Sequence, residues 1–168
     1  MLDLGCGEGK NAAYLARLGC IVEAWDISDA ALNNARAAWP ETPVRWQLKD
    51  ALSISTESRK FDVIIAYGLY HCLPSETINK VINKVQLITN KDGYNIIVAY
   101  NDRRHINTGS AHPGFNPVLI PHADYLDAYI NWSIIESSDE DLTERHPNNM
   151  IQHTHSMTRM LAQNRNEG

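Results

Sequence analysis

Short apolar runs alternate with segments of helical periodicity along the first hundred residues of the chain. The runs at 20–26, 61–67 and 94–100 are rich in Val and Ile. Near-continuous apolar runs of this length are typical of parallel strands that are buried on both faces. A weaker run at 43–48 predicts a strand nearer the edge of the sheet.

Between these runs, three segments carry apolar residues at the spacing of a helix face. The residues are Ala12, Leu15 and Ala16; Leu32, Ala35 and Trp39; and Ile78, Val81, Ile82, Val85 and Ile88. Gly19, Pro40 and the turn-like run at 91–93 supply the stops. Strand and helix in alternation predict a doubly wound α/β fold, a parallel sheet with right-handed crossovers.

The last third of the chain follows a different pattern. Residues 101–120 are polar and contain Gly and Pro, so they predict a loop, and 121–130 predicts a short helix. Two strand-like segments at 132–138 and 150–163 flank "RHPNN", which is typical of a hairpin turn. The sheet is therefore expected to end in an antiparallel pair.

Length and charge narrow the class of protein. The chain has 168 residues, the size of a single domain, and a net charge of −5 with no basic cluster, which speaks against nucleic acid as a partner. No run of 18 apolar residues indicates a membrane span, and no signal peptide is visible. The odd number of cysteines, Cys6, Cys20 and Cys72, favours free thiols in the cytoplasm.

Candidate chemistry begins with the opening stretch "MLDLGCGEGK". Gly5, Gly7 and Gly9 follow a short strand and precede a helix, where glycines let a ligand approach the backbone and the helix start offers free N–H groups. The spacing G-x-G-x-G differs from the dinucleotide pattern G-x-G-x-x-G. Asp3 before the loop would repel a diphosphate but suits a cation.

The stretch "LDLGCGEG" resembles the first motif of class I S-adenosylmethionine-dependent methyltransferases. The resemblance implies a strand order of 3-2-1-4-5-7-6 and S-adenosyl-L-methionine as cofactor. It places an acid at the end of the second strand against the ribose hydroxyls and a residue pair after the third strand against the adenine. The implied cofactor-binding residues are Asp3, Gly5, Cys6, Gly7, Gly9, Asp26, Ile27, Asp50, Ala51 and Tyr67.

Further along, "DGYNIIVAY" and "GFNPVLIPHADYLDAYINWSII" are similar to the tellurite-resistance type of methyltransferase. This likeness implies a small anionic or soft acceptor. The type carries a segment before the glycine loop that this chain lacks, so we expect uncovered apolar surface and self-association, such as a homodimer. Two alternatives stay open, an O-methyltransferase acting on a carboxylate or hydroxyl of a metabolite or peptide, and a cofactor-binding subunit without independent catalysis.

The tellurite type also carries a His-Arg pair after the sixth strand and a further Arg on the last strand. In "LTERHPNN", Arg145 takes the Arg position, and the His is displaced to His146 or replaced by Glu144. Ser156 or a neighbouring His stands where the last-strand Arg is expected. Arg145 and His146 could hold an anionic acceptor, or they could be a solvated hairpin tip.

Methyl transfer requires a nucleophile held about 3–3.5 Å from the activated carbon, and a base only if that nucleophile must lose a proton. His71, just after the fourth strand, is the candidate base, and its alternative is packing against the following helix. Tyr67 and Tyr70 could wall the methyl group or belong to the core. The run at 103–105 could reach the same space or lie in solvent.

His153 and His155 are two residues apart on a predicted strand and so share a face. With His146 they could supply three metal ligands. A strand pair facing solvent or a partner fits the pattern better, and no metal site is predicted.

Overall fold

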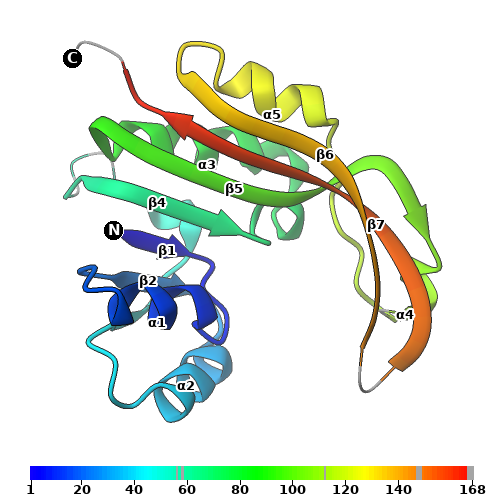
Figure 1. The fold of residues 1–168 in the computed structure, drawn as a ribbon, viewed down its shortest axis with the longest axis horizontal. Helices are drawn as coiled ribbons and strands as arrows, with labels where there is room; N and C mark the ends of the chain where they lie inside the picture. Colours follow the sequence, from blue (N-terminus) through cyan, green and yellow to red (C-terminus); the bar gives the residue numbers. More distant parts are fainter. Residues whose placement is uncertain (56, 58, 112, 147–148, 166–168) are drawn as a thin grey trace.

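The computed structural model describes residues 1–168 except 56, 58, 112, 147–148 and 166–168, and only the backbone of 111, 146 and 149. The described chain forms one seven-stranded sheet in the order β3-β2-β1-β4-β5-β7-β6, shown in Figure 1. The strands are β1 (Leu2–Leu4), β2 (Glu23–Asp26), β3 (Arg45–Leu48), β4 (Phe61–Tyr67), β5 (Thr89–Ile106), β6 (Ser133–His146) and β7 (Asn149–Gln163). The predicted strand order is confirmed.

The strands from β3 to β5 run parallel, and β7 pairs antiparallel with both β5 and β6. The helices are α1 (Lys10–Arg17), α2 (Asp29–Ala38), α3 (Ser75–Leu87), α4 (Thr108–Ala111) and α5 (His122–Ala128), with 3₁₀ turns η1 (Ala51–Ser53) and η2 (Tyr70–Cys72). Among the described residues, no helix is long and apolar enough to cross a membrane. The doubly wound α/β prediction is confirmed.

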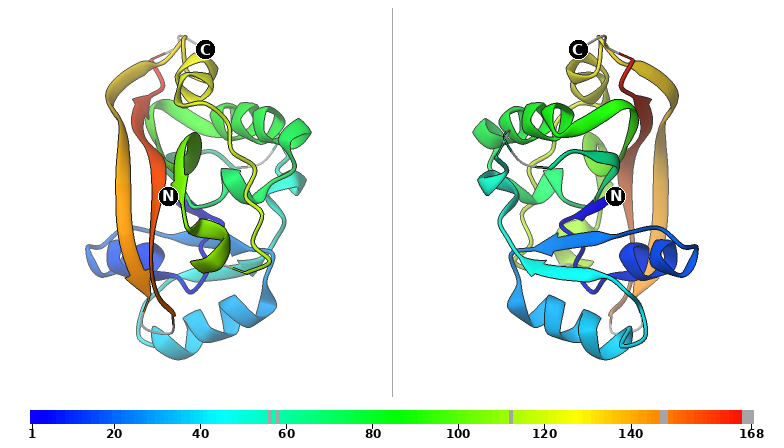
Figure 2. Two further views of the ribbon diagram at one scale, coloured as in Figure 1. Left: turned by 90° about the vertical axis from the view of Figure 1, so that its right-hand side faces the viewer. Right: turned by 90° about the vertical axis from the view of Figure 1, so that its left-hand side faces the viewer.

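Alternating side chains of β1 divide the core between the two faces of the sheet. Leu2 and Leu4 are fully buried in the cluster that includes α3, whereas Ala12 and Ala16 of α1 pack with Ala24 on the other face. Figure 2 shows α1 and α3 on opposite sides of the sheet. Asp3, between the two leucines, therefore points to the α1 side, where the glycine loop lies.

The expected loop at 101–120 is wrong in its first part, because β5 continues to Ile106 and α4 follows. The pairing of β5 with β7 is interrupted after Tyr100 and resumes where His105 lies opposite His155. The Arg103 guanidinium forms ion pairs with Asp139 Oδ2 at 2.9 Å and with Asp141 Oδ1 at 2.7 Å, both on β6. Polar residues that look loop-like in sequence are strand residues here because these charged partners lie beside them.

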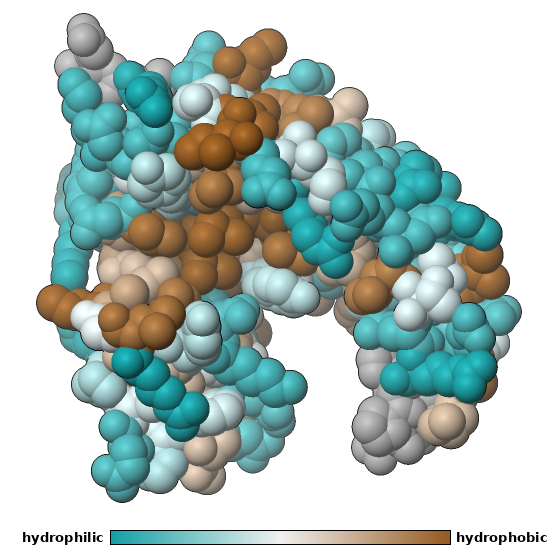
Figure 3. All heavy atoms as spheres, viewed as in Figure 1, coloured by the Kyte–Doolittle hydropathy of each residue, from teal (hydrophilic) through white to brown (hydrophobic). Residues whose placement is uncertain are grey.

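The turn expected at 91–93 also lies within β5, and Asp92 takes a left-handed φ of 60° at a register shift. At the other end, β6 and β7 curve away from the sheet as a long arm. Figure 3 shows a broad hollow between this arm and the part of the molecule that holds α1 and α2. The carboxyl ends of the parallel strands open toward this hollow.

Candidate functional site

The glycine loop between β1 and α1 is shaped by positive φ angles. Gly5, Gly7 and Gly9 have φ of 72°, 52° and 75°, which side chains on L-residues disfavour. The N–H groups of Gly5 and Cys6 both donate to the carbonyl of Trp25, at 2.8 and 3.0 Å. The loop is thereby fixed to the end of β2.

The three glycines differ in what surrounds them. A Cβ on Gly9 would stand 2.3 Å from the Trp46 ring and 3.2 Å from the Ala35 side chain, so Gly9 allows close packing. A Cβ on Gly7 would meet nothing within 4 Å. Gly7 thus faces open space, whereas Gly9, predicted as a cofactor contact, is a buried residue packed against Trp46 and Ala35 at the edge of the second hollow described below.

Asp26 closes the loop from the end of β2. Its Oδ2 accepts from the backbone N–H of Gly7 at 2.7 Å, and its Oδ1 accepts from the N–H of Ser28 at 2.8 Å. Ser28 in turn caps α2 through the N–H of Ala31. A carboxylate with two oxygens has further lone pairs, so Asp26 can still accept from ligand hydroxyls.

A hollow of about 390 Å³ lies beside Asp26, within the range of small-molecule sites. Ile27 forms part of its wall with a side chain that is 72 % exposed, an apolar surface that a bound ligand would cover. Its lining residues are Gly5, Asp26, Ile27, Lys49, Asp50, Ala51, Leu52, Gly68, Leu69, Cys72, Leu73 and Pro74. Asp26, Ile27, Asp50 and Ala51 are therefore brought together as the sequence predicts.

Asp50 has a local role as well. Its Oδ1 accepts from the N–H of Leu52 at 2.8 Å and caps the η1 turn. This cap sets the backbone of Ala51 at the wall of the hollow. Gly68 and Leu69, which the sequence analysis did not single out, complete the opposite wall, and the only signal for them was their place directly after β4.

A second hollow of about 500 Å³ adjoins the first at Gly5. It is lined by Gly5, Cys6, Gly7, Glu8, Gly9, Lys10, Asn11 and Tyr67. Tyr67 stands at the end of β4 with half of its surface exposed, as a residue beside a ligand would. The two hollows together offer an elongated site across the glycine loop.

Asp3 is buried in β1 just before this loop, and Cys6 is part of the loop. Asp3 is 2 % exposed, and its Oδ2 has no hydrogen-bond partner among the described residues. Burial, with the charge of Asp26 nearby, raises the pKa of Asp3 to about 6. Burial and the same two carboxylates raise the pKa of Cys6 to about 12, so its thiol stays protonated and is no nucleophile. An unsatisfied buried carboxylate fits a cationic ligand.

His71, the candidate base, lies in η2 and is 6 % exposed. Its Nδ1 accepts from the backbone N–H of Tyr100 at 3.0 Å, which leaves the proton of the neutral ring on Nε2. Burial, followed by the nearby His105, lowers the pKa of His71 to about 4. In this tautomer His71 is a hydrogen-bond donor, so the geometry does not favour the predicted base.

Tyr70 does not wall the site as one reading of the sequence expected. It is fully buried in the core and packs against the ring of Tyr125, with centroids 6.2 Å apart. The 3₁₀ turn η2 rotates it away from the end of β4. Tyr67 alone of the two tyrosines faces the hollow.

The two residues proposed to hold an anion lie at the tip of the arm. Arg145 is exposed and donates from Nη2 to Gln152 Oε1 at 2.9 Å. His146 ends β6, and its side chain lies outside the described residues. Arg103 and Arg104, the other basic candidates, are occupied by ion pairs to Asp141 at 2.7 and 3.1 Å. Arg103 and Arg104 thus join strands instead of facing the hollow.

Comparison with known proteins agrees with this fold. A family profile described as "Methyltransferase domain" matches residues 1–93, more than half of the chain. The chain is 35 % identical over 108 residues to the "Probable S-adenosyl-L-methionine-dependent methyltransferase TehB" of Haemophilus influenzae. That match covers 59 % of this chain and 35 % of the relative, so the chain spans about a third of the length of such curated relatives.

Solved structures show the same fold. The crystal structure of TehB from Haemophilus influenzae superimposes with a TM-score of 0.80 at 21 % identity, over 96 % of this chain and 57 % of that one. Magnesium protoporphyrin IX methyltransferase from Synechocystis, solved with bound S-adenosylmethionine, gives a TM-score of 0.65 at 17 % identity, over 94 % and 68 %. This chain belongs to the S-adenosylmethionine-dependent methyltransferases. The predicted family and cofactor are confirmed.

Proposed function

We propose that this chain transfers the methyl group of S-adenosylmethionine to a small acceptor of the kind used by tellurite-resistance methyltransferases. The observation that supports it most is the loop of Gly5 to Gly9 tied to Asp26, with an apolar hollow beside it. When bound, the cofactor supplies a methyl group on a positively charged sulfur. The work left to the protein is to bind, orient and exclude water.

In this proposal each cofactor residue has a defined role, and Asp26 has two. Asp26 accepts from the ribose hydroxyls while it holds the loop, and Ile27 and Ala51 form the apolar wall for the base. Asp50 accepts from the base edge. The N–H groups of Gly5, Cys6 and Gly7 are bonded to Trp25 and Asp26, so the loop would face the amino-acid tail of the cofactor with carbonyl oxygens, which suit its ammonium group, and Asp3 would add negative charge nearby.

The part of the site that would bind the acceptor has fewer positively charged groups than the tellurite type. Ser156 or a neighbouring His stands where the tellurite type carries an Arg on its last strand. The Ser156 hydroxyl donates to Asp141 at 2.9 Å. Arg145 is the candidate for an anionic acceptor in the arm, with His146 beside it in sequence. His71 contributes an N–H donor to the same side of the cofactor site.

Two other functions stay as alternatives. An O-methyltransferase acting on a carboxylate or hydroxyl would need a base to accept the proton of a hydroxyl, and His71 holds the wrong tautomer for that. A cofactor-binding subunit that depends on a partner for catalysis agrees with the open hollow in Figure 3. The chain spans about a third of the length of its curated relatives. Methyl transfer by this chain alone is therefore itself part of what we propose.

Calorimetric titration of the purified protein with S-adenosylmethionine, followed by an assay for S-adenosylhomocysteine with candidate acceptors, tests the proposal. Saturable binding and product formation support it. Binding without product from any oxyanion, thiol, carboxylate or hydroxyl acceptor would favour the binding subunit. No binding at all would contradict the proposal.

We further propose that the chain is one domain that acts in the cytoplasm and self-associates. Free thiols at Cys6, Cys20 and Cys72 support a reducing compartment. Leu18 and Ile21 expose 64 % and 79 % of their surface around the α1–β2 turn, an apolar area that a second copy could cover. Sedimentation at several concentrations tests the dimer, and a monomer throughout would contradict it.

A further inference from the structure

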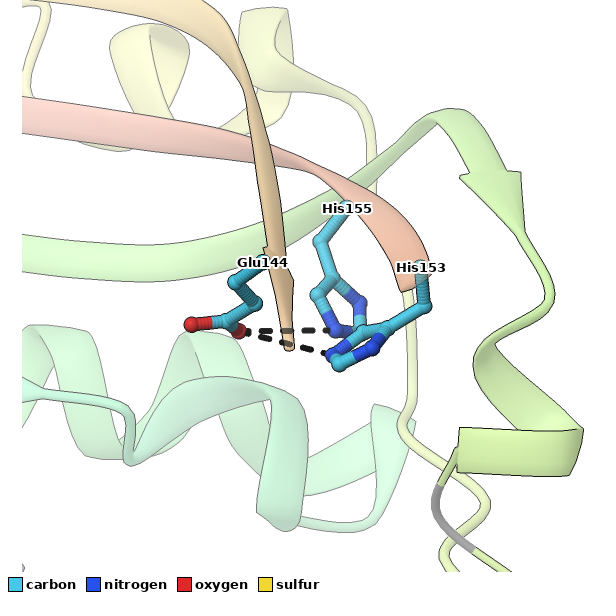
Figure 4. A group of neighbouring side chains, drawn as sticks. All are labelled: Glu144, His153 and His155. Carbon is cyan, nitrogen blue, oxygen red and sulfur yellow. Dashed lines mark ion pairs between the residues drawn. The ribbon is translucent and has the colours of Figure 1, made fainter. Parts of the chain in front are cut away.

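Two histidines and a glutamate gather on the inner face of the curved arm. Glu144 of β6 lies opposite His153 of β7, and His155 follows two residues later on the same face. Figure 4 shows the three side chains pointing toward one another from the two strands. Glu144 Oε1 is 3.6 Å from His153 Nε2 and 4.0 Å from His155 Nε2.

Both imidazoles are deeply buried, at 1 % exposure each, whereas the Glu144 side chain is 30 % exposed. The rings are held by aromatic packing. His155 stacks on Tyr100 with centroids 4.1 Å apart and planes 5° apart, and His153 meets His155 edge-on at 4.9 Å and 81°. Phenyl rings would pack equally well, so packing alone does not account for ring nitrogens directed at a carboxylate.

The hydrogen bond on the far side of His153 indicates which of its nitrogens carries the proton. Nδ1 lies 3.0 Å from the carbonyl oxygen of Ile151, and only an N–H is attracted to a carbonyl. When His153 binds a metal ion it is deprotonated at Nε2, and the lone pair of that nitrogen is then on the side where the Glu144 carboxylate lies. Such a pair is stabilised by a cation between the two atoms, and a carbonyl on the other ring nitrogen is the usual support of a metal-binding histidine.

We propose that Glu144, His153 and His155 bind a divalent first-row transition ion such as Zn²⁺. The three ligand atoms lie within 4.8 Å of one another. Bonds of about 2.0–2.2 Å in a tetrahedral site bring such atoms to about 3.3–3.5 Å, so small side-chain rotations suffice. Imidazole nitrogens favour Zn²⁺ and its neighbours over Mg²⁺ and Ca²⁺, which prefer oxygen ligands.

The place of this site in the fold gives it a connection to the rest of the molecule. Tyr100 is stacked between His155 and His71, at 4.1 and 4.2 Å, and His71 lies beside Gly68 in the wall of the cofactor hollow. Three protein ligands leave a fourth position of a tetrahedral ion for an exchangeable ligand. The proposal goes beyond methyl transfer, and ion binding can be measured without cofactor or acceptor.

The test is calorimetric titration of chelator-treated protein with Zn²⁺, with the bound metal counted after dialysis. We expect one tightly bound Zn²⁺ per chain, and at least about tenfold weaker binding in His153→Ala, His155→Ala and Glu144→Gln. Co²⁺ in place of Zn²⁺ should give the intense visible absorption of a four-coordinate ion. An equal concentration of Mg²⁺ should not compete.

His122→Asn is the matched control, because it removes an imidazole whose Nδ1 bonds Thr158, outside the group of three. It should bind Zn²⁺ as the parent does. Glu144 is partly exposed, so Glu144→Gln remains informative if truncation of a buried histidine prevents folding, which circular dichroism reports. Absence of binding in the parent, unchanged binding in Glu144→Gln, an equal loss in His122→Asn, or displacement by Mg²⁺ would each overturn the proposal.

Discussion

Asp26 Oδ2 accepts the backbone N–H of Gly7 at 2.7 Å, so the carboxylate at the end of β2 holds the loop at the end of β1 in place. The two groups are 19 residues apart in sequence and are joined by the parallel pairing of β1 with β2. One carboxylate is therefore expected to serve both the shape of the loop and the binding of the cofactor.

Asp26→Ala should lose both functions. Each charge-assisted hydrogen bond removed costs about 1.5–3 kcal/mol, which corresponds to a tenfold or greater loss of cofactor affinity. Calorimetry with S-adenosylmethionine measures it, with Asp29→Ala on the exposed start of α2 as the control. Equal affinity of Asp26→Ala and the parent would contradict the assignment.

The two glycines at the middle and end of the loop should respond differently to alanine. Both have positive φ, so each substitution costs about 1–2 kcal/mol of backbone strain. Gly9→Ala also forces a methyl group against Trp46, which adds about 1–3 kcal/mol to the loss of stability. Urea unfolding should show the larger loss for Gly9→Ala, while Gly7→Ala should weaken the cofactor more than its small loss of stability explains. The reverse order in urea would contradict the packing role of Gly9.

Protonation of Asp3 should make the cofactor-free protein more stable as the pH falls from about 7 to 5. Its pKa is raised to about 6 in the folded protein, above the usual value of 3.8, so the folded state binds the proton more tightly than the unfolded chain. Asp3→Asn should remove about 1 kcal/mol of this gain and be the more stable protein at pH 7. Urea unfolding at both pH values measures the difference between variant and parent, and a difference that is the same at pH 5 and 7 would refute the raised pKa.

His71, in contrast, should make the folded protein less stable as the pH falls over the same range. Its pKa is lowered to about 4, below the usual 6.5, so its contribution to stability is present above pH 6.5 and is lost as the pH falls toward 4. Asparagine can accept from the N–H of Tyr100 without titrating. His71→Asn should therefore unfold less readily than the parent in acid, by about 2 kcal/mol at pH 5 relative to pH 7. If both proteins lose stability equally, His71 is not buried in its neutral form.

Arg145 gives the test of the acceptor site. Lysine keeps the charge but loses the planar fork, so turnover of an anionic acceptor held by two hydrogen bonds should fall in both Arg145→Lys and Arg145→Ala. Gln152→Ala, which removes the partner of Arg145 at 2.9 Å, is the control for arm structure. Unchanged turnover in both Arg145 variants would place the acceptor near Tyr67 and His71 instead. Activity on tellurite-like oxyanions should be weak because Ser156 or a neighbouring His stands where the tellurite type carries its last-strand Arg, and Arg159 on the same strand is paired with Glu140 at 2.8 Å.

Local signals in the sequence predicted the parallel half of the fold and the glycine loop. The apolar runs predicted buried strands, the glycine spacing predicted a ligand loop, and the resemblance to class I methyltransferases added Asp26 at the end of the second strand. These features depend on residues that are neighbours in sequence or lie at the ends of adjacent parallel strands. Because hydrophobic period and positive φ are properties of short segments, no tertiary contact was needed to see them.

The sequence predicted an antiparallel pair at the end of the chain, but only the tertiary structure decided how far these strands extend and which side chains meet on them. The polar run from Asn101 to His105 stays extended because Arg103 and Arg104 pair with the carboxylates of β6 and His105 resumes the pairing with β7. Glu144 meets His153 and His155 only through the antiparallel register, which no local pattern specifies. The tautomer and pKa of His71 likewise follow from burial and from a backbone N–H 29 residues away. Long-range strand pairing and desolvation depend on segments that are distant in sequence, so they can be read only from the folded chain.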